Sequence, residues 1–211
     1  MKAPFQHSPL AEEFWARGRS NSCPIYDMHG HMGPHSAIYF PRAEAPAMIR
    51  TMDACGVRLL CFSHHTSLHA PDLSNRRSIE AVRQFPSRFR AYCTINPNYP
   101  ELVAREVASL GSLCPDVYVG FKFLSDYHKV PLTDPRYEPA WAYADAHELL
   151  VLAHTWGGSP YDGQDVVREV ASRYTNVKLL LGHSCHGAWD AAIDLVRDFP
   201  NVYLELTAVF D

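Results

Sequence analysis

Residues 149–156 read LLVLAHTW, and this stretch decides the fold. Five apolar residues run without a break to His154, and a more polar, helix-like sequence begins soon after it. An uninterrupted apolar run of this kind is typical of a strand that is buried on both faces, as in a parallel sheet covered by helices. The stretch therefore predicts one unit of an α/β protein, with a polar side chain at the carboxyl end of its strand.

Similar apolar runs recur along the whole chain. They occupy residues 23–30, 57–65, 89–97, 117–124, 177–184 and 202–209. Between the runs lie amphipathic stretches with helical periodicity, at residues 43–55, 74–85, 100–110, 139–149, 163–174 and 187–199. The alternation of seven strands with six helices predicts a parallel α/β sheet.

Polar residues at the strand ends favour a barrel over an open sheet. A doubly wound sheet usually carries a glycine-rich phosphate loop after its first strand, but here that strand leads into HGHMGPH. A (β/α)8 barrel of the TIM type instead carries functional residues at the ends of many strands. Such residues recur here roughly every 24 to 34 positions, about one βα unit each. We therefore predict a TIM-type barrel with about seven strands in this chain.

Composition narrows the possible partners and compartment. The net charge is −4 and no Lys/Arg run occurs, which argues against a nucleic acid partner. No apolar run approaches the roughly 20 residues that span a bilayer, and the N-terminus lacks a signal-like apolar segment. We expect a cytoplasmic protein with six buried, reduced cysteines. We expect one domain over residues 1–211, with residues 1–22 as an N-terminal extension. We expect the chain to form either a monomer or a homodimer.

Histidines at the strand ends predict a metal site. The run DMHGH alternates Asp27, His29 and His31, so a strand places these side chains on one face. An isolated HxH is more often a polar loop. His154 and His183 change this balance, because each is a lone polar side chain closing an apolar run. Neutral imidazole suits zinc, iron, manganese and nickel ions. The four histidines together predict a metal site at the barrel mouth.

Four further residues are candidates for binding a substrate. Lys122 interrupts an apolar strand, and burying an ammonium group is costly. It is either a charge that reaches the polar mouth or a cation for an anionic, carboxylated small molecule. His64 lies in a histidine-rich stretch for which an ordinary surface loop is an equally good interpretation. Asn96 and Trp156 are predicted as pocket wall. The remaining histidines assigned to the surface are His7, His35, His128 and His147.

The ordered set of motifs resembles the amidohydrolase superfamily. The matching features are a DxHxH on the first strand, a GxK lysine on the fourth, and a histidine ending each of the fifth and sixth strands. The set is similar to amidohydrolase family 2, which includes metal-dependent hydrolases and aminocarboxymuconate-semialdehyde-type decarboxylases. The resemblance runs from about residue 23 to the end of the chain. It implies a hydrolase that uses a metal-activated water on an amide, ester or lactone. Decarboxylation of an unsaturated or aromatic acid is the alternative.

The resemblance also implies a role for each residue. His29, His31 and His154 would bind the metal. His183 would be the catalytic acid/base, or a ligand of a second ion. Lys122 matches a lysine that is carbamylated in binuclear members, and we expect it to be unmodified here. Zinc is the expected metal, with manganese, iron or nickel as alternatives.

One element of the family pattern has no match in this sequence. The pattern includes an aspartate at the end of an eighth strand, whereas Glu205 lies on the seventh run and Asp211 follows that run without a helix. A (β/α)8 barrel takes about 250 residues. We therefore expect the chain to be an N-terminal portion of a longer protein; a seven-stranded domain and closure by another chain are the alternatives. A metal-binding protein without catalytic activity is the alternative from another functional class.

Overall fold

Helices and strands alternate along the chain in the computed structural model, which describes residues 8–208. The strands are β1 (Ile25–Met32), β2 (Val57–His64), β3 (Phe89–Thr94), β4 (Tyr118–Phe123), β5 (Leu150–Trp156), β6 (Lys178–His186) and β7 (Val202–Leu204). The α-helices are α1 (Pro9–Arg17), α2 (Ala45–Cys55), α3 (Pro71–Gln84), α4 (Pro100–Leu110), α5 (Ser125–His128), α6 (Glu138–Ala146), α7 (Gln164–Arg173) and α8 (Trp189–Asp198). Two 3-10 turns, η1 (His65–Leu68) and η2 (Pro135–Tyr137), complete the elements of this part of the chain.

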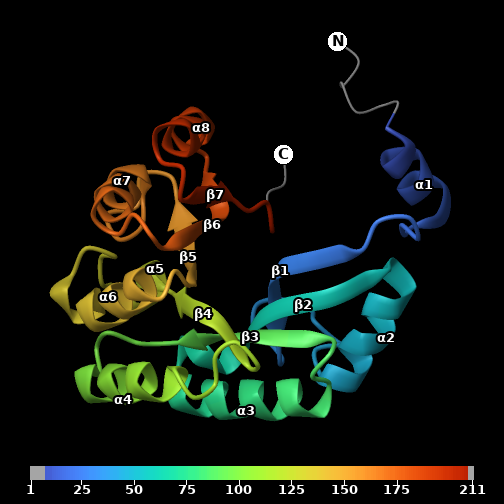
Figure 1. The fold of residues 1–211 in the computed structure, drawn as a ribbon, viewed down its shortest axis with the longest axis horizontal. Coiled ribbons are helices and arrows are strands. Elements are labelled where there is room, and N and C mark those ends of the chain that lie inside the picture. Colours follow the sequence, from blue (N-terminus) through green and yellow to red (C-terminus); the bar gives the residue numbers. More distant parts are fainter. Residues whose placement is uncertain (1–7, 209–211) are drawn as a thin grey trace.

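The strands form one parallel sheet in the order β1-β2-β3-β4-β5-β6-β7. The sheet curls, and the helices that connect its strands lie on its outer side (Figure 1). Consecutive parallel strands joined by outer helices are the architecture of a (β/α)8 barrel. Within the described residues, seven of its strands are present, which confirms the predicted fold class.

Two apolar clusters lie on the two sides of the sheet. The larger cluster fills the space between the strands and the outer helices, and it includes Phe89, Phe121 and Trp141. The smaller one lies inside the curl, where Tyr92 and Leu152 are fully buried. The Tyr92 hydroxyl donates to the Met28 carbonyl oxygen at 2.9 Å and so links β3 to β1 through the interior. This inner cluster lies inside the barrel, below the residues at the strand ends.

All the predicted strands and helices form, most with ends shifted by a few residues, whereas α1, α5, η1 and η2 were not predicted. All seven apolar runs form strands, but β7 covers only Val202–Leu204 because the residues after it leave the sheet. The α1 helix was not predicted, and it lies apart from the sheet (Figure 1). None of its residues is buried, so it leaves no apolar periodicity of a packed face in the sequence.

At two positions, neighbouring atoms leave no room for a Cβ atom, so glycine is needed there. Gly120 has φ +153°, and a Cβ there would meet the Leu150 carbonyl oxygen at 1.7 Å, so it permits β4 and β5 to pair closely. A Cβ on Gly30 would lie 2.6 Å from the Leu60 side chain. The glycine of the HGH motif therefore serves the packing of β1 against β2.

No helix in the described part of the chain is both long and apolar enough to cross a bilayer. All six cysteines are free, which agrees with the expectation of reduced thiols. The expectation that all are buried is wrong for Cys23 and Cys55, which are exposed before β1 and at the end of α2, and for Cys114, which is half-buried.

Candidate functional site

The carboxyl ends of β1, β4, β5 and β6 bring five of the predicted residues together. Ring centroids lie 4.9 Å apart for His29 and His31, 5.3 Å for His29 and His183, and 5.1 Å for His154 and His183. The Lys122 Nζ atom lies 3.0 Å from Nε2 of His29. The ends of parallel strands thus concentrate four imidazoles and one amine in the barrel mouth, as the strand-end pattern predicted.

In three of the histidines, the Nδ1 atom contacts an oxygen atom, and this contact fixes the orientation of the ring. Nδ1 of His29 lies 2.6 Å from a carboxylate oxygen of Glu205, and Nδ1 of His154 lies 3.0 Å from one of Asp162. Nδ1 of His183 lies 2.6 Å from the Thr207 carbonyl oxygen. Because a carboxylate or carbonyl oxygen only accepts hydrogen bonds, each Nδ1 carries the hydrogen. In the neutral ring this leaves Nε2 without a hydrogen, as an acceptor.

Burial keeps the rings of His29, His31 and His183 uncharged near neutral pH. It lowers the pKa of His29, His31 and His183, and the nearby Lys122 ammonium adds to this lowering. Glu205 favours a protonated His29, but the ammonium hydrogen bond occupies the Nε2 lone pair where the second proton would have to go. We therefore treat His29 as neutral and as an acceptor at Nε2.

Lys122 is the buried charge of the site. Its side chain is fully enclosed, and its Nζ donates to Nε2 of His29. Burial lowers its pKa to about 7, while the carboxylates of Glu205 and Asp162 oppose this shift. An amine with this pKa is a cation in part of the population at neutral pH and can bind an anionic group.

The donor chemistry fits a divalent cation. Imidazoles whose Nδ1–H groups donate to oxygens are the usual form of histidine ligands, because that outer contact fixes the ring and leaves Nε2 for the metal. Within residues 8–208, however, no three or more His, Cys, Asp or Glu side chains are spaced to hold an ion. In this arrangement Lys122 takes the Nε2 atom of His29, so a cation reaches that atom only when Lys122 releases it.

A cavity of about 320 Å³ opens over the cluster. Of the predicted residues, it is lined by His31, Lys122, His154, Trp156 and His183. His29 does not line the cavity; its Nε2 atom contacts Lys122. Three aromatic side chains, those of Phe40, Tyr127 and Trp156, form much of the wall.

Two predicted pocket residues lie elsewhere. The His64 ring lines a different groove, between α2 and α3. His65 lines the cavity in the place that was expected for His64. The reason is local, because Nδ1 of His64 accepts from the Thr66 backbone and caps η1. Asn96 is also absent from the cavity wall; its side-chain oxygen accepts from the Asn98 backbone and shapes the loop after β3.

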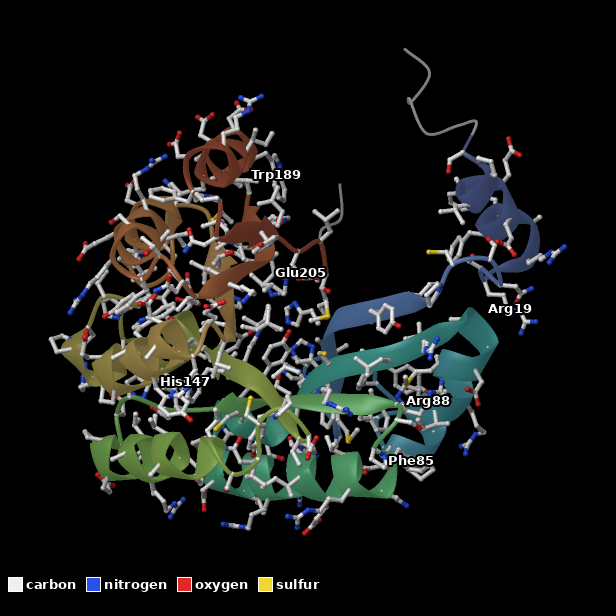
Figure 2. The ribbon with its side chains drawn as sticks, in the orientation of Figure 1. Arg19, Phe85, Arg88, His147, Trp189 and Glu205 are labelled. Atoms are coloured by element: carbon white, nitrogen blue, oxygen red, sulfur yellow. The ribbon has the colours of Figure 1, made fainter. Side chains whose placement is uncertain are left out.

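The histidines that were assigned to the surface differ in where they lie. His147 is exposed just after α6 (Figure 2), as predicted. His35 lines the outer part of the cavity, and His128 is buried at the end of α5, contrary to prediction. His7 lies outside the described residues.

Comparison with known proteins identifies the family. A family model described as Amidohydrolase (Amidohydro_2) matches residues 26–211, which is most of the chain and contains the whole site. The chain belongs to the amidohydrolase family. No curated protein matches this amidohydrolase.

Solved structures share the amidohydrolase fold at low sequence identity. 5-Carboxyvanillate decarboxylase LigW from Sphingomonas paucimobilis is 18% identical with a TM-score of 0.55, over 68% of this chain and 53% of its own. Dihydroxybenzoic acid decarboxylase from Polaromonas sp. JS666, with bound manganese and 2-nitroresorcinol, is 17% identical with a TM-score of 0.58, over 85% and 78%. A probable 2-pyrone-4,6-dicarboxylic acid hydrolase from Acinetobacter baumannii is 12% identical with a TM-score of 0.57, over 88% and 71%. The chain thus spans about half the length of LigW, and these likenesses show the fold alone.

A strained turn presents His183 to the cavity of the amidohydrolase. The backbone φ angles of His183, Ser184 and Cys185 are +67°, +51° and +51°, a left-handed run that non-glycine residues rarely adopt. Thr155 on β5 binds both sides of this turn. Its hydroxyl donates to the Gly182 carbonyl oxygen at 2.7 Å and accepts from the Cys185 amide at 2.9 Å. Sequence reasoning missed Thr155 and the bonding role of Glu205, because each acts through a partner distant in the chain. It also missed Asp162, which reaches His154 from the loop after β5.

Replacing Thr155 with valine is expected to relax this turn. Valine keeps the volume but leaves the buried Cys185 amide without an acceptor, which costs about 1–3 kcal/mol of unfolding free energy. Urea unfolding of Thr155→Val measures this loss. Thr155→Ser, which keeps the hydroxyl, is the matched control and should be the more stable of the two variants. Equal stability of the two variants would show that the hydroxyl does not hold the turn.

Proposed function

We propose that this amidohydrolase is a metal-dependent hydrolase, which adds water to the carbonyl carbon of a small amide, ester or lactone. The observation that carries the proposal is the state of His183. Its Nδ1–H donates to the Thr207 carbonyl oxygen, and the ring lines the cavity, so a neutral Nε2 is available as a base. Hydrolysis needs such a base to take a proton from the attacking water.

Three histidines would hold the metal. His29, His31 and His154 offer imidazole nitrogens from β1 and β5, and two of these rings are braced at Nδ1 by carboxylates. A bound divalent cation supplies a Lewis acid and makes hydroxide accessible near neutral pH. Zinc suits an all-histidine donor set, and the manganese in the Polaromonas decarboxylase makes manganese the second ion to test.

The cavity wall supports a small, flat substrate with one anionic group. Phe40, Tyr127 and Trp156 offer ring surfaces to a planar molecule. Among the described residues that line the cavity, Lys122 is the only lysine or arginine. It lies at the histidine end, where it would pair with a carboxylate of the substrate.

Decarboxylation is the second candidate reaction. The same aromatic walls and Lys122 suit an aromatic carboxylic acid, and two of the similar structures are decarboxylases of such acids by name. In this reaction the bond from the ring to the carboxyl carbon breaks, carbon dioxide leaves, and a proton from a cavity acid replaces it on the ring carbon.

Turnover assays with the metal-loaded chain test both proposals. Zinc- and manganese-loaded protein is offered lactones, aryl esters and anilides, and separately benzoic acids labelled in the carboxyl carbon. Hydrolysis lost in His183→Asn supports the hydrolase, and release of labelled carbon dioxide supports the decarboxylase. Because burial lowers the pKa of His183 from 6.5, protonation of this base should reduce the hydrolytic rate only below pH 6.5. Metal binding without turnover of any of these substrates would support a binding protein instead.

A further inference from the structure

Glu205 reaches across the interior of the barrel from the end of β7. One of its carboxylate oxygens lies 2.6 Å from Nδ1 of His29 on β1, which is 176 residues away in the chain. Glu205 lies at the end of β7, on the side that faces β1 (Figure 2). Alternate strands of a (β/α)8 barrel contribute side chains to the same interior layer, so β1 and β7 can meet in this way.

Every hydrogen-bond partner of the Glu205 carboxylate donates to it. One oxygen accepts from Nδ1 of His29 and, at 3.4 Å, from the His183 backbone amide. The other oxygen accepts from the Thr207 backbone amide at 2.7 Å and from the Thr207 hydroxyl. Only a side chain with two acceptor oxygens satisfies this set, because the NH2 group of glutamine would point a donor at other donors.

We propose that Glu205 is a positioning residue that fixes His29 and the His183 turn with a single carboxylate. It holds the hydrogen of His29 on Nδ1, so that the Nε2 lone pair faces the site, and it accepts from the backbone of the residue assigned as the base. This inference rests on the proposed function for the roles of the two histidines. The alternative is a link that only ties β7 to β1.

The test uses Glu205→Gln. Glutamine keeps the length and shape of the side chain and replaces one of the two acceptor oxygens with an NH2 group. Nitrogen NMR of the metal-free protein, with labelled histidine, reports which nitrogen of His29 carries the hydrogen. Chelator competition with Zn²⁺ and Mn²⁺ measures metal affinity. Glu148→Gln is the matched control, since Glu148 forms an exposed ion pair with Lys178 at 3.7 Å, away from the site.

The expected result is an Nδ1–H tautomer of His29 in the wild-type chain, which Glu205→Gln changes or mixes. Metal affinity should fall about 10- to 100-fold in Glu205→Gln, as is usual when an outer partner of a ligand is lost, and should stay unchanged in Glu148→Gln. Wild-type affinity and an unchanged tautomer in Glu205→Gln would overturn the proposal.

Two further outcomes remain decisive. If Glu205→Gln fails to fold, an Nε2–H tautomer of His29 in the wild-type spectrum still contradicts the proposal. If the wild-type chain binds neither ion, the proposed function fails. The tautomer comparison in metal-free protein still tests Glu205 in that case.

Discussion

Replacing His29 or His154 with alanine is expected to remove most of the metal binding of the chain. Each ring comes from a different strand, and each is oriented by its own carboxylate, so neither can substitute for the other. Losing a ligand should cost more than the roughly 10- to 100-fold in affinity that the loss of an outer partner costs. Metal analysis after loading and dialysis, together with chelator competition for Zn²⁺ and Mn²⁺, measures the effect.

Two other histidines make this experiment specific. His147→Ala removes an exposed ring after α6, away from the strand ends, and should leave metal content unchanged (Figure 2). His183→Ala should retain more metal than His29→Ala, because His183 is assigned as the base. If His29→Ala and His154→Ala both keep the metal content of the wild-type chain, the proposed site is wrong.

The barrel and its histidine cluster could be predicted because they depend on local sequence and one topological rule. Runs such as LLVLAHTW identify buried strands, and parallel strands bring their carboxyl ends to one side. His29, His154 and His183 therefore meet even though their positions in the chain are far apart. The alternation of side chains along a strand also placed His31 beside His29 correctly.

What the sequence could not predict depends on contacts across the barrel and at strand ends. Glu205 is one glutamate at the end of a run, and nothing local indicates that it meets His29 across the interior. The choice between His64 and His65 depends on how η1 begins after β2, since His64 turns back to cap it. Asp162 lies in the loop between β5 and α7, and its contact with His154 depends on how that loop folds back on β5.

Replacing Lys122 with methionine is expected to stabilise the metal-free protein while it weakens substrate binding. Methionine fills similar space without a buried charge, and burying an ammonium group is costly. In chelator-treated protein, urea unfolding at pH 6 should therefore show Lys122→Met to be more stable than the wild type. If Lys122 pairs with a substrate carboxylate, its loss should raise KM about 10- to 100-fold, the equivalent of one charge-assisted hydrogen bond.

The pH dependence separates this explanation from simple repacking. Lys122 has a pKa of about 7 in the folded chain, against 10.5 for an ordinary lysine. Between these pH values the unfolded chain holds a proton that the folded chain lacks, so the wild type gains stability from this group as pH rises, by at most about 1.4 kcal/mol per pH unit. The advantage of Lys122→Met should thus be largest below pH 7 and shrink toward pH 10. Lys178→Met, which replaces an exposed lysine, should show no such trend. An advantage of Lys122→Met that is independent of pH would contradict a buried, charge-bearing Lys122.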